Sequence, residues 1–122
     1  MPPQKDLPLS LYMTTTDTAM GAMLAQIPCN EERAIYYISK KFQGYETKYT
    51  QVEKSCLALV WDTKKLRHYM LAHPVEVYSK LDPIKYLFEK PVLNGRIARW
   101  TLMVSEFELK YTPVRAQKWI LC

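Results

Sequence analysis

The sequence is poor in the residues that several common kinds of functional site require. It has only three glycines in 122 residues, which excludes a glycine-rich loop that cradles phosphates. Its three cysteines, Cys29, Cys56 and Cys122, lie far apart without a Cys-x-x-Cys pair, so neither a disulfide framework nor a zinc site is expected. Cys56 falls within the apolar pattern of a helix, where we expect a small core residue.

Long apolar runs are also missing. The N-terminus carries no apolar stretch of signal-peptide length, and no later stretch approaches the roughly 20 apolar residues that span a bilayer. We therefore expect no membrane partner and an intracellular product, either cytoplasmic or nuclear.

The composition is that of one soluble globular domain, with 48% hydrophobic and 24% charged residues. The formal net charge is +5, which permits binding to a polyanion because cationic side chains release counterions from a phosphate backbone. Solvated lysines that only keep a protein in solution explain the same charge, so composition leaves both interpretations open.

The first third of the chain predicts a three-stranded antiparallel meander. Residues 9–13 alternate between apolar and polar, residues 19–25 form a small-residue apolar run, and residues 34–38 are rich in β-branched and aromatic side chains. Asp17 would lie in the bend between the first two strands.

A long helix should follow the meander. Thr50 and Glu53 have the spacing of a capping box, in which each side chain bonds the backbone N–H of the other residue. Apolar residues then recur at spacings of three and four as far as about Met70, and His73-Pro74 ends the pattern.

The remaining segments alternate between strand and helix. Residues 75–78 predict a short strand, and the long helix before it favours a crossover to a strand parallel to an earlier one. Residues 83–88 and 96–107 suit two further helices, and residues 107–111 a final strand. The order predicts an α/β fold, with three antiparallel strands, a crossover helix and parallel strands in a mixed sheet partly covered by helices.

Short motifs in a fixed order cover nearly the whole chain. They are Asp17-Thr-Ala-Met-Gly-Ala-Met-Leu24, Tyr36-Tyr-Ile-Ser-Lys40, Glu46-Thr-Lys-Tyr49, Glu53-Lys-Ser-Cys-Leu-Ala-Leu-Val-Trp61, Lys65-Leu-Arg-His-Tyr69, Pro83-Ile-Lys-Tyr86, Gly95-Arg-Ile-Ala-Arg-Trp100 and Ser105-Glu-Phe107. In these motifs the chain resembles the RNase H-like domain that follows the polymerase in gypsy-type long-terminal-repeat retrotransposons, especially those of plants. The resemblance implies an RNase H-like fold over residues 8–112 and a divergent or truncated tail over residues 113–122.

The resemblance also implies a chemistry, the hydrolysis of the RNA strand of an RNA–DNA hybrid. In this family two Mg²⁺ (or Mn²⁺) ions, held by four carboxylates, act on the scissile phosphate. Two divalent ions about 4 Å apart repel each other unless clustered carboxylates neutralise them. The number of carboxylates retained therefore indicates whether a copy can cleave.

By the same resemblance, the four family carboxylates are incompletely matched. The first falls on Asp17, which is either a retained metal ligand or a turn residue, while the second aligns with Ser55 and leaves Glu53 as the capping partner. The third aligns with Lys80, and Asp82 is placed to cap the next helix. The fourth belongs to a C-terminal Ala-Asp-x-Leu helix, which this sequence lacks. Asp17, Glu53 and Asp82 are thus the candidate catalytic residues, and Asp17 is the candidate metal ligand.

We therefore expect a degenerate RNase H-like module that serves as a connection or nucleic-acid-associating domain. Its implied partners are the polymerase domain of the parent polyprotein and an RNA–DNA hybrid. The candidate contacts to the hybrid are basic side chains: Lys40, Lys41, Lys64, Lys65, Arg67, Arg96 and Arg99.

Two alternatives stay open. One is an active RNA–DNA hybrid ribonuclease, in which Asp17, Glu53 and Asp82 form the site. The other is a retroelement-derived protein-interaction scaffold or a pseudogene product. In either case, loss of the last family helix should leave apolar surface exposed.

Overall fold

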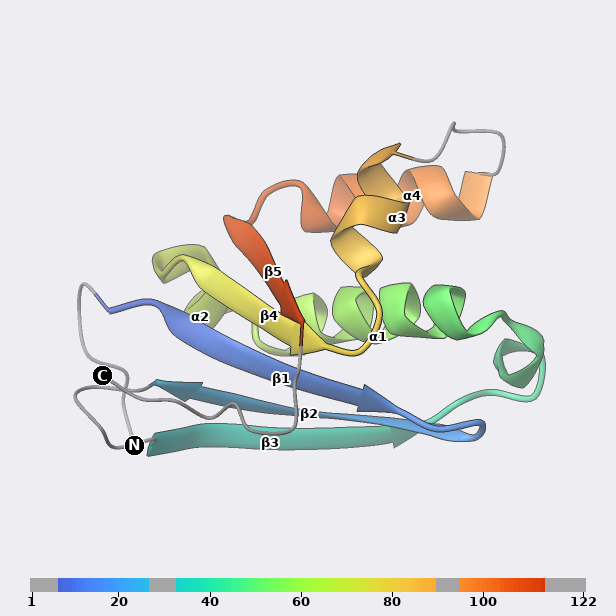
Figure 1. Cartoon of the computed structure of the whole chain (residues 1–122), viewed down its shortest axis with the longest axis horizontal. Helices are drawn as coiled ribbons and strands as arrows, with labels where there is room; N and C mark the ends of the chain where they lie inside the picture. Colours follow the sequence, from blue (N-terminus) through green and yellow to red (C-terminus); the bar gives the residue numbers. More distant parts are fainter. Residues whose placement is uncertain (1–6, 27–32, 90–94, 114–122) are drawn as a thin grey trace.

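The computed structural model describes residues 7–26, 33–89 and 95–113, which form a five-stranded sheet and its helices (Figure 1). The elements in chain order are β1 (Leu9–Thr15), β2 (Ala19–Gln26), β3 (Arg33–Lys41), the 3-10 turn η1 (Glu46–Lys48), α1 (Gln51–Lys65), α2 (Arg67–Ala72), β4 (Val75–Ser79), α3 (Pro83–Glu89), α4 (Gly95–Val104) and β5 (Leu109–Pro113).

The sheet has the strand order β3-β2-β1-β4-β5. The first three strands pair antiparallel, with a register shift between Leu24 and Ala25, and β4 pairs parallel with both β1 and β5. A parallel pair needs a crossover connection, and α1 and α2 supply it between β1 and β4. The predicted α/β class with a mixed sheet is confirmed.

One face of the sheet is covered by helices, and we call it the covered face. Leu11, Leu24 and Val77 point from three neighbouring strands into this layer and are fully buried. They join one core with Leu59 of α1, while α3 and α4 pack against α1 from its other side (Figure 1). Cys56 belongs to the same core, so its predicted role as a small buried residue is confirmed.

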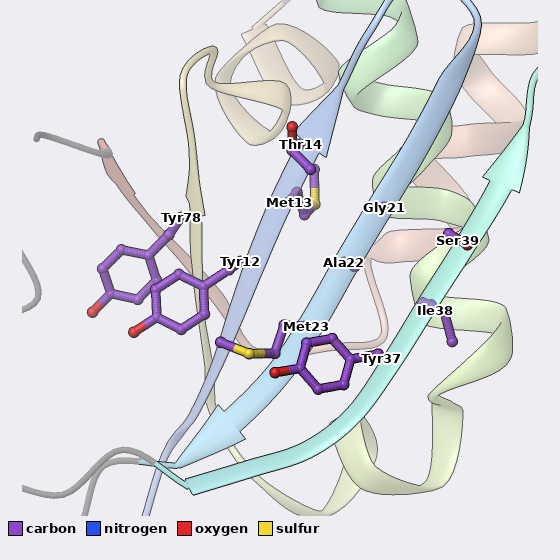
Figure 2. A pocket seen from close by; sticks show the side chains of 10 residues that line it. All are labelled: Tyr12, Met13, Thr14, Gly21, Ala22, Met23, Tyr37, Ile38, Ser39 and Tyr78. Carbon is purple, nitrogen blue, oxygen red and sulfur yellow. The ribbon is translucent and has the colours of Figure 1, made fainter.

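None of the helices in the described ranges covers the opposite face, which we call the open face (Figure 1). The strand register places Tyr37, Met23, Tyr12 and Tyr78 in one row across it. Figure 2 shows these side chains on the same side of the sheet, with the rings of Tyr12 and Tyr78 stacked at a centroid distance of 4.8 Å. The row borders a shallow, mainly apolar groove of about 600 Å³.

The long predicted helix is broken, which corrects the prediction of one helix to about Met70. Leu66 separates α1 from α2, with φ −112° and ψ 23°, values outside the helical region. Leu66 and Met70 are both buried and keep a spacing of four residues across the break. The apolar periodicity is therefore uninterrupted, and the sequence carries no signal for the break.

The last helix also ends earlier than predicted. α4 stops at Val104 instead of Phe107, and β5 begins at Leu109. The Phe107 backbone N–H donates to the Val104 carbonyl at 3.2 Å, and the turn places the Phe107 ring in the core. In the sequence, the apolar residue Phe107 continues the apolar spacing of α4, so the helix was predicted three residues too long.

Candidate functional site at the ends of β1 and β4

A polar hollow lies where β1 and β4 end. Because these strands run parallel, their carboxyl ends meet at one edge of the sheet, and the first turns of α1 lie beside that edge. The hollow measures about 460 Å³. We call it the strand-end hollow, and its lining residues are Met13, Thr14, Thr15, Gln51, Ser55, Ser79, Lys80 and Leu81.

The polar lining consists of hydroxyls, one amide and one ammonium group. Ser79 is 4% exposed, and its hydroxyl donates to the Leu81 carbonyl at 2.7 Å. Ser55 is 5% exposed, and its hydroxyl has no hydrogen-bond partner among the described residues. Lys80 is exposed and forms no ion pair with a described carboxylate. None of the described residues that line the hollow is Asp or Glu.

Asp17 lies beside this hollow and not in its lining. It occupies the exposed β1–β2 turn, which the Thr16 hydroxyl closes by accepting from the Ala19 N–H at 3.1 Å. The Gln51 side chain donates to the Asp17 carboxylate at 3.4 Å, and the buried Lys54 ammonium donates to the Asp17 carbonyl at 3.0 Å. Asp17 therefore holds the turn against the start of α1.

Glu53 is occupied by structural contacts. It completes the predicted capping box, accepting from the Thr50 N–H at 3.0 Å, while the Thr50 hydroxyl accepts from the Glu53 N–H at 3.3 Å. Arg96 donates to the same carboxylate at 3.0 Å and lies over the Tyr49 ring. Burial alone would raise the pKa of Glu53, but the bonds from Thr50 and the charge of Arg96 lower it overall. The carboxylate is thus held ionised at the helix start.

Asp82 caps α3. Its carboxylate accepts from the Lys85 backbone N–H at 2.9 Å, the role that an aspartate directly before a helix-opening proline usually has. It does not line the hollow. The structure therefore does not bring Asp17, Glu53 and Asp82 together.

The fit of this region to Mg²⁺ is poor. Within residues 7–26, 33–89 and 95–113, no group of three or more His, Cys, Asp or Glu side chains could hold a metal ion. Lys80 would repel a cation at this edge of the sheet. The residues present therefore do not fit the pair of ions that the resemblance implies, and the assignment of Asp17 as a metal ligand stays a prediction.

Ser55 and Lys80, the positions that the resemblance aligned with two family carboxylates, both line the strand-end hollow. Thr14, which sequence analysis passed over, lines it as well. The predicted parallel crossover could have indicated Thr14, because it implies that the ends of β1 and β4 lie side by side.

The candidate basic residues differ in whether their side chains already contact acidic or aromatic groups of the domain. Arg67 pairs with Glu106 at 2.6 Å, and Arg96 pairs with Glu53. The ammonium groups of Lys40 and Lys65 lie 5.7 and 5.9 Å from the Trp61 ring centre. The other three candidates are exposed on β3, α1 and α4: Lys41, Lys64 and Arg99.

The family model of the RNase H-like domain found in reverse transcriptase matches residues 4–107. The chain belongs to this family. The Pol polyproteins of transposons 297 and opus from Drosophila melanogaster are 30% and 31% identical to this RNase H-like domain over 110 and 109 residues. The match covers 88% and 87% of the chain but only 10% and 11% of those polyproteins. The chain therefore spans about a tenth of the length of these relatives.

Solved structures share the RNase H-like fold. A foamy viral protease-reverse transcriptase in complex with dsDNA has a TM-score of 0.74 at 19% identity and covers 97% of this chain and 25% of that one. The same type of enzyme in complex with an RNA/DNA hybrid gives 0.71 at 20% identity, covering 94% and 16%. Among the described residues of the domain, no helix has the length and hydropathy of a membrane span.

Proposed function

We propose that this RNase H-like domain is a degenerate copy, without metal-dependent cleavage, that acts as a connection module beside a polymerase domain and associates with an RNA–DNA hybrid. The observation that carries the proposal is the lining of the strand-end hollow. Hydroxyls at Thr14 and Ser55 and an ammonium at Lys80 occupy the sheet edge where a two-metal site would need carboxylates.

Proteins that share this fold bind nucleic acids of the proposed kind. The foamy viral enzymes that share the fold were solved with dsDNA and with an RNA/DNA hybrid. The net charge of +5 and the exposed cations Lys41, Lys64 and Arg99 are suited to contacts with a phosphate backbone.

The module would extend over residues 8–112, with residues 113–122 as a divergent tail; residues 114–122 lie outside the described part of the chain. Mg²⁺ or Mn²⁺ would be needed only if cleavage occurs.

The test is incubation of the purified chain with an end-labelled RNA–DNA hybrid and Mg²⁺ or Mn²⁺, with the Asp17→Asn variant alongside. We expect no cleavage from either protein, with circular dichroism showing that both are folded. We also expect binding at low salt that weakens steeply as salt rises.

Cleavage that is lost in Asp17→Asn would contradict the proposal and favour the active ribonuclease. A folded chain that neither cleaves nor binds the hybrid at low salt would favour the interaction scaffold instead.

A further inference from the structure

The strand-end hollow combines three features that a metal site does not need and an anion site does. Among the described residues that line it, Lys80 is the charged one and others supply hydroxyl donors, and the hollow is large enough for a phosphate group. Ammonium groups bind phosphate as point charges, and hydroxyls donate to its oxygens.

Ser55 points to a ligand independently of the lysine. It is 5% exposed, lines the hollow, and its hydroxyl has no hydrogen-bond partner among the described residues. The hydroxyl oxygen is not itself sealed off, so it can donate to a group that enters the hollow. A bound anion would supply the missing acceptor.

The neighbouring charges limit the affinity but leave Lys80 available. The Asp17 carboxylate accepts from Gln51, which lines the hollow, and Asp82 accepts from the Lys85 backbone. Glu53 is neutralised by Arg96 at 3.0 Å. Asp17 and Asp82 therefore repel an anion from outside the hollow, while Lys80 attracts it from inside.

We propose that the strand-end hollow binds a phosphate group through the Lys80 ammonium and the hydroxyls of Ser55 and Thr14. The ammonium replaces the metal ions as the positive charge at this edge of the sheet. The inference rests on the proposed function for its natural ligand, a phosphodiester of the hybrid backbone. Free inorganic phosphate shares the chemistry and is tested separately.

The first experiment titrates the full ¹⁵N-labelled chain with inorganic phosphate while amide shifts are followed, at constant ionic strength with chloride as the reference anion. Shifts should gather at Thr14, Ser55 and Lys80. Lys80→Gln should weaken phosphate binding about tenfold, as expected for loss of one charge-assisted contact. Lys85→Gln removes the same charge from α3, outside the hollow lining, and should change binding less than about twofold.

Two further variants separate an anion site from a metal site and from a general charge effect. Asp17→Asn removes a repelling carboxylate, so it should tighten phosphate binding, whereas it would weaken a metal site. Ser55→Ala leaves the charge unchanged and should weaken binding a few-fold. Equal effects of Lys80→Gln and Lys85→Gln, or no shifts at the hollow with phosphate in the tens of millimolar, would overturn the inference.

The second experiment measures hybrid binding by fluorescence anisotropy across a salt series. Lys80→Gln should reduce the slope of log affinity against log salt by about 1, the loss of one phosphate contact, while Lys85→Gln should not. Hybrid binding with an unchanged slope in Lys80→Gln overturns the inference and leaves the proposed function standing. Phosphate binding at the hollow without hybrid binding supports the inference and overturns the proposed function.

Discussion

The two faces of the sheet are made from the same strands but have different consequences for the molecule. On the covered face, Leu11, Leu24 and Val77 are fully buried under α1. On the open face, Tyr37 is 68% exposed and Tyr12 is half-buried. Burial provides most of the stability of a domain, so the covered face should determine whether the chain folds. The open face should contribute less to stability, and the polar hollow lies at the end of the sheet where β1 and β4 finish.

The sharpest test of this comparison uses two adjacent residues of β2 that point to opposite faces. Leu24→Ala should lower the free energy of unfolding by about 2–5 kcal/mol, because it leaves a cavity in the core. Met23→Ala, on the open face, should lower it by less than about 1 kcal/mol. Urea unfolding followed by tryptophan fluorescence measures both values. Equal losses would show that the open face is packed as tightly as the covered one.

Asp62 is the exception on the covered side of the molecule. It is 1% exposed on α1, and one carboxyl oxygen, Oδ2, has no hydrogen-bond partner in the part of the chain that the structure describes. Burial raises the pKa of Asp62 well above 3.8, so at a pH between the unfolded and folded pKa values the folded chain retains a proton that the unfolded chain has released. The contribution of Asp62 to stability is therefore most favourable below about pH 4 and decreases as pH rises toward its folded pKa.

Asp62→Ala should accordingly raise the free energy of unfolding at pH 7 by about 1–3 kcal/mol, with a much smaller gain near pH 4. Chemical denaturation at the two pH values measures the difference. Glu89→Ala, at an exposed position of α3, is the control and should change stability by less than about 0.5 kcal/mol. A loss of stability in Asp62→Ala at pH 7 would mean that this carboxylate has a favourable partner.

The strand-end hollow, where the two faces of the sheet meet, should bind a metal ion once its lining contains carboxylates. The double variant Ser55→Glu with Lys80→Asp places two carboxylates in the strand-end hollow. Mg²⁺ at tenfold excess over its Kd should then stabilise the fold by about 1.4 kcal/mol, which a thermal melt with and without the ion detects. Ser39→Glu with Lys41→Asp makes the same charge change on β3 and should show no Mg²⁺ effect. Matching responses in the two double variants would contradict a site at this edge.

The smallest expected effect concerns the start of α1, whose first turns line the strand-end hollow. Thr50→Ala removes the side chain that accepts from the Glu53 N–H and should lower the free energy of unfolding by about 1 kcal/mol. Thr50→Ser retains the hydroxyl and should restore most of it. If Thr50→Ala is as stable as the parent chain, packing alone holds the helix start.

Most of the fold could be predicted from local patterns. The capping box at Thr50 and Glu53 and the order of strands and helices are confirmed, because periodicity and capping act over a few residues. The break at Leu66 was not predictable, since the buried residues keep their spacing across it. Asp62 also carried no signal, because a single acidic residue in a helix is usually exposed.

The sequence by itself determined which chemical groups are available, among them a serine at position 55 and a lysine at position 80. Only the tertiary structure decided which of those groups meet. It placed Thr14 with Ser55 and Lys80 in one hollow and left Asp17, Glu53 and Asp82 outside it in structural roles. The physical reason is the parallel pairing of β1 with β4, a long-range contact that brings strand ends together across an intervening helix.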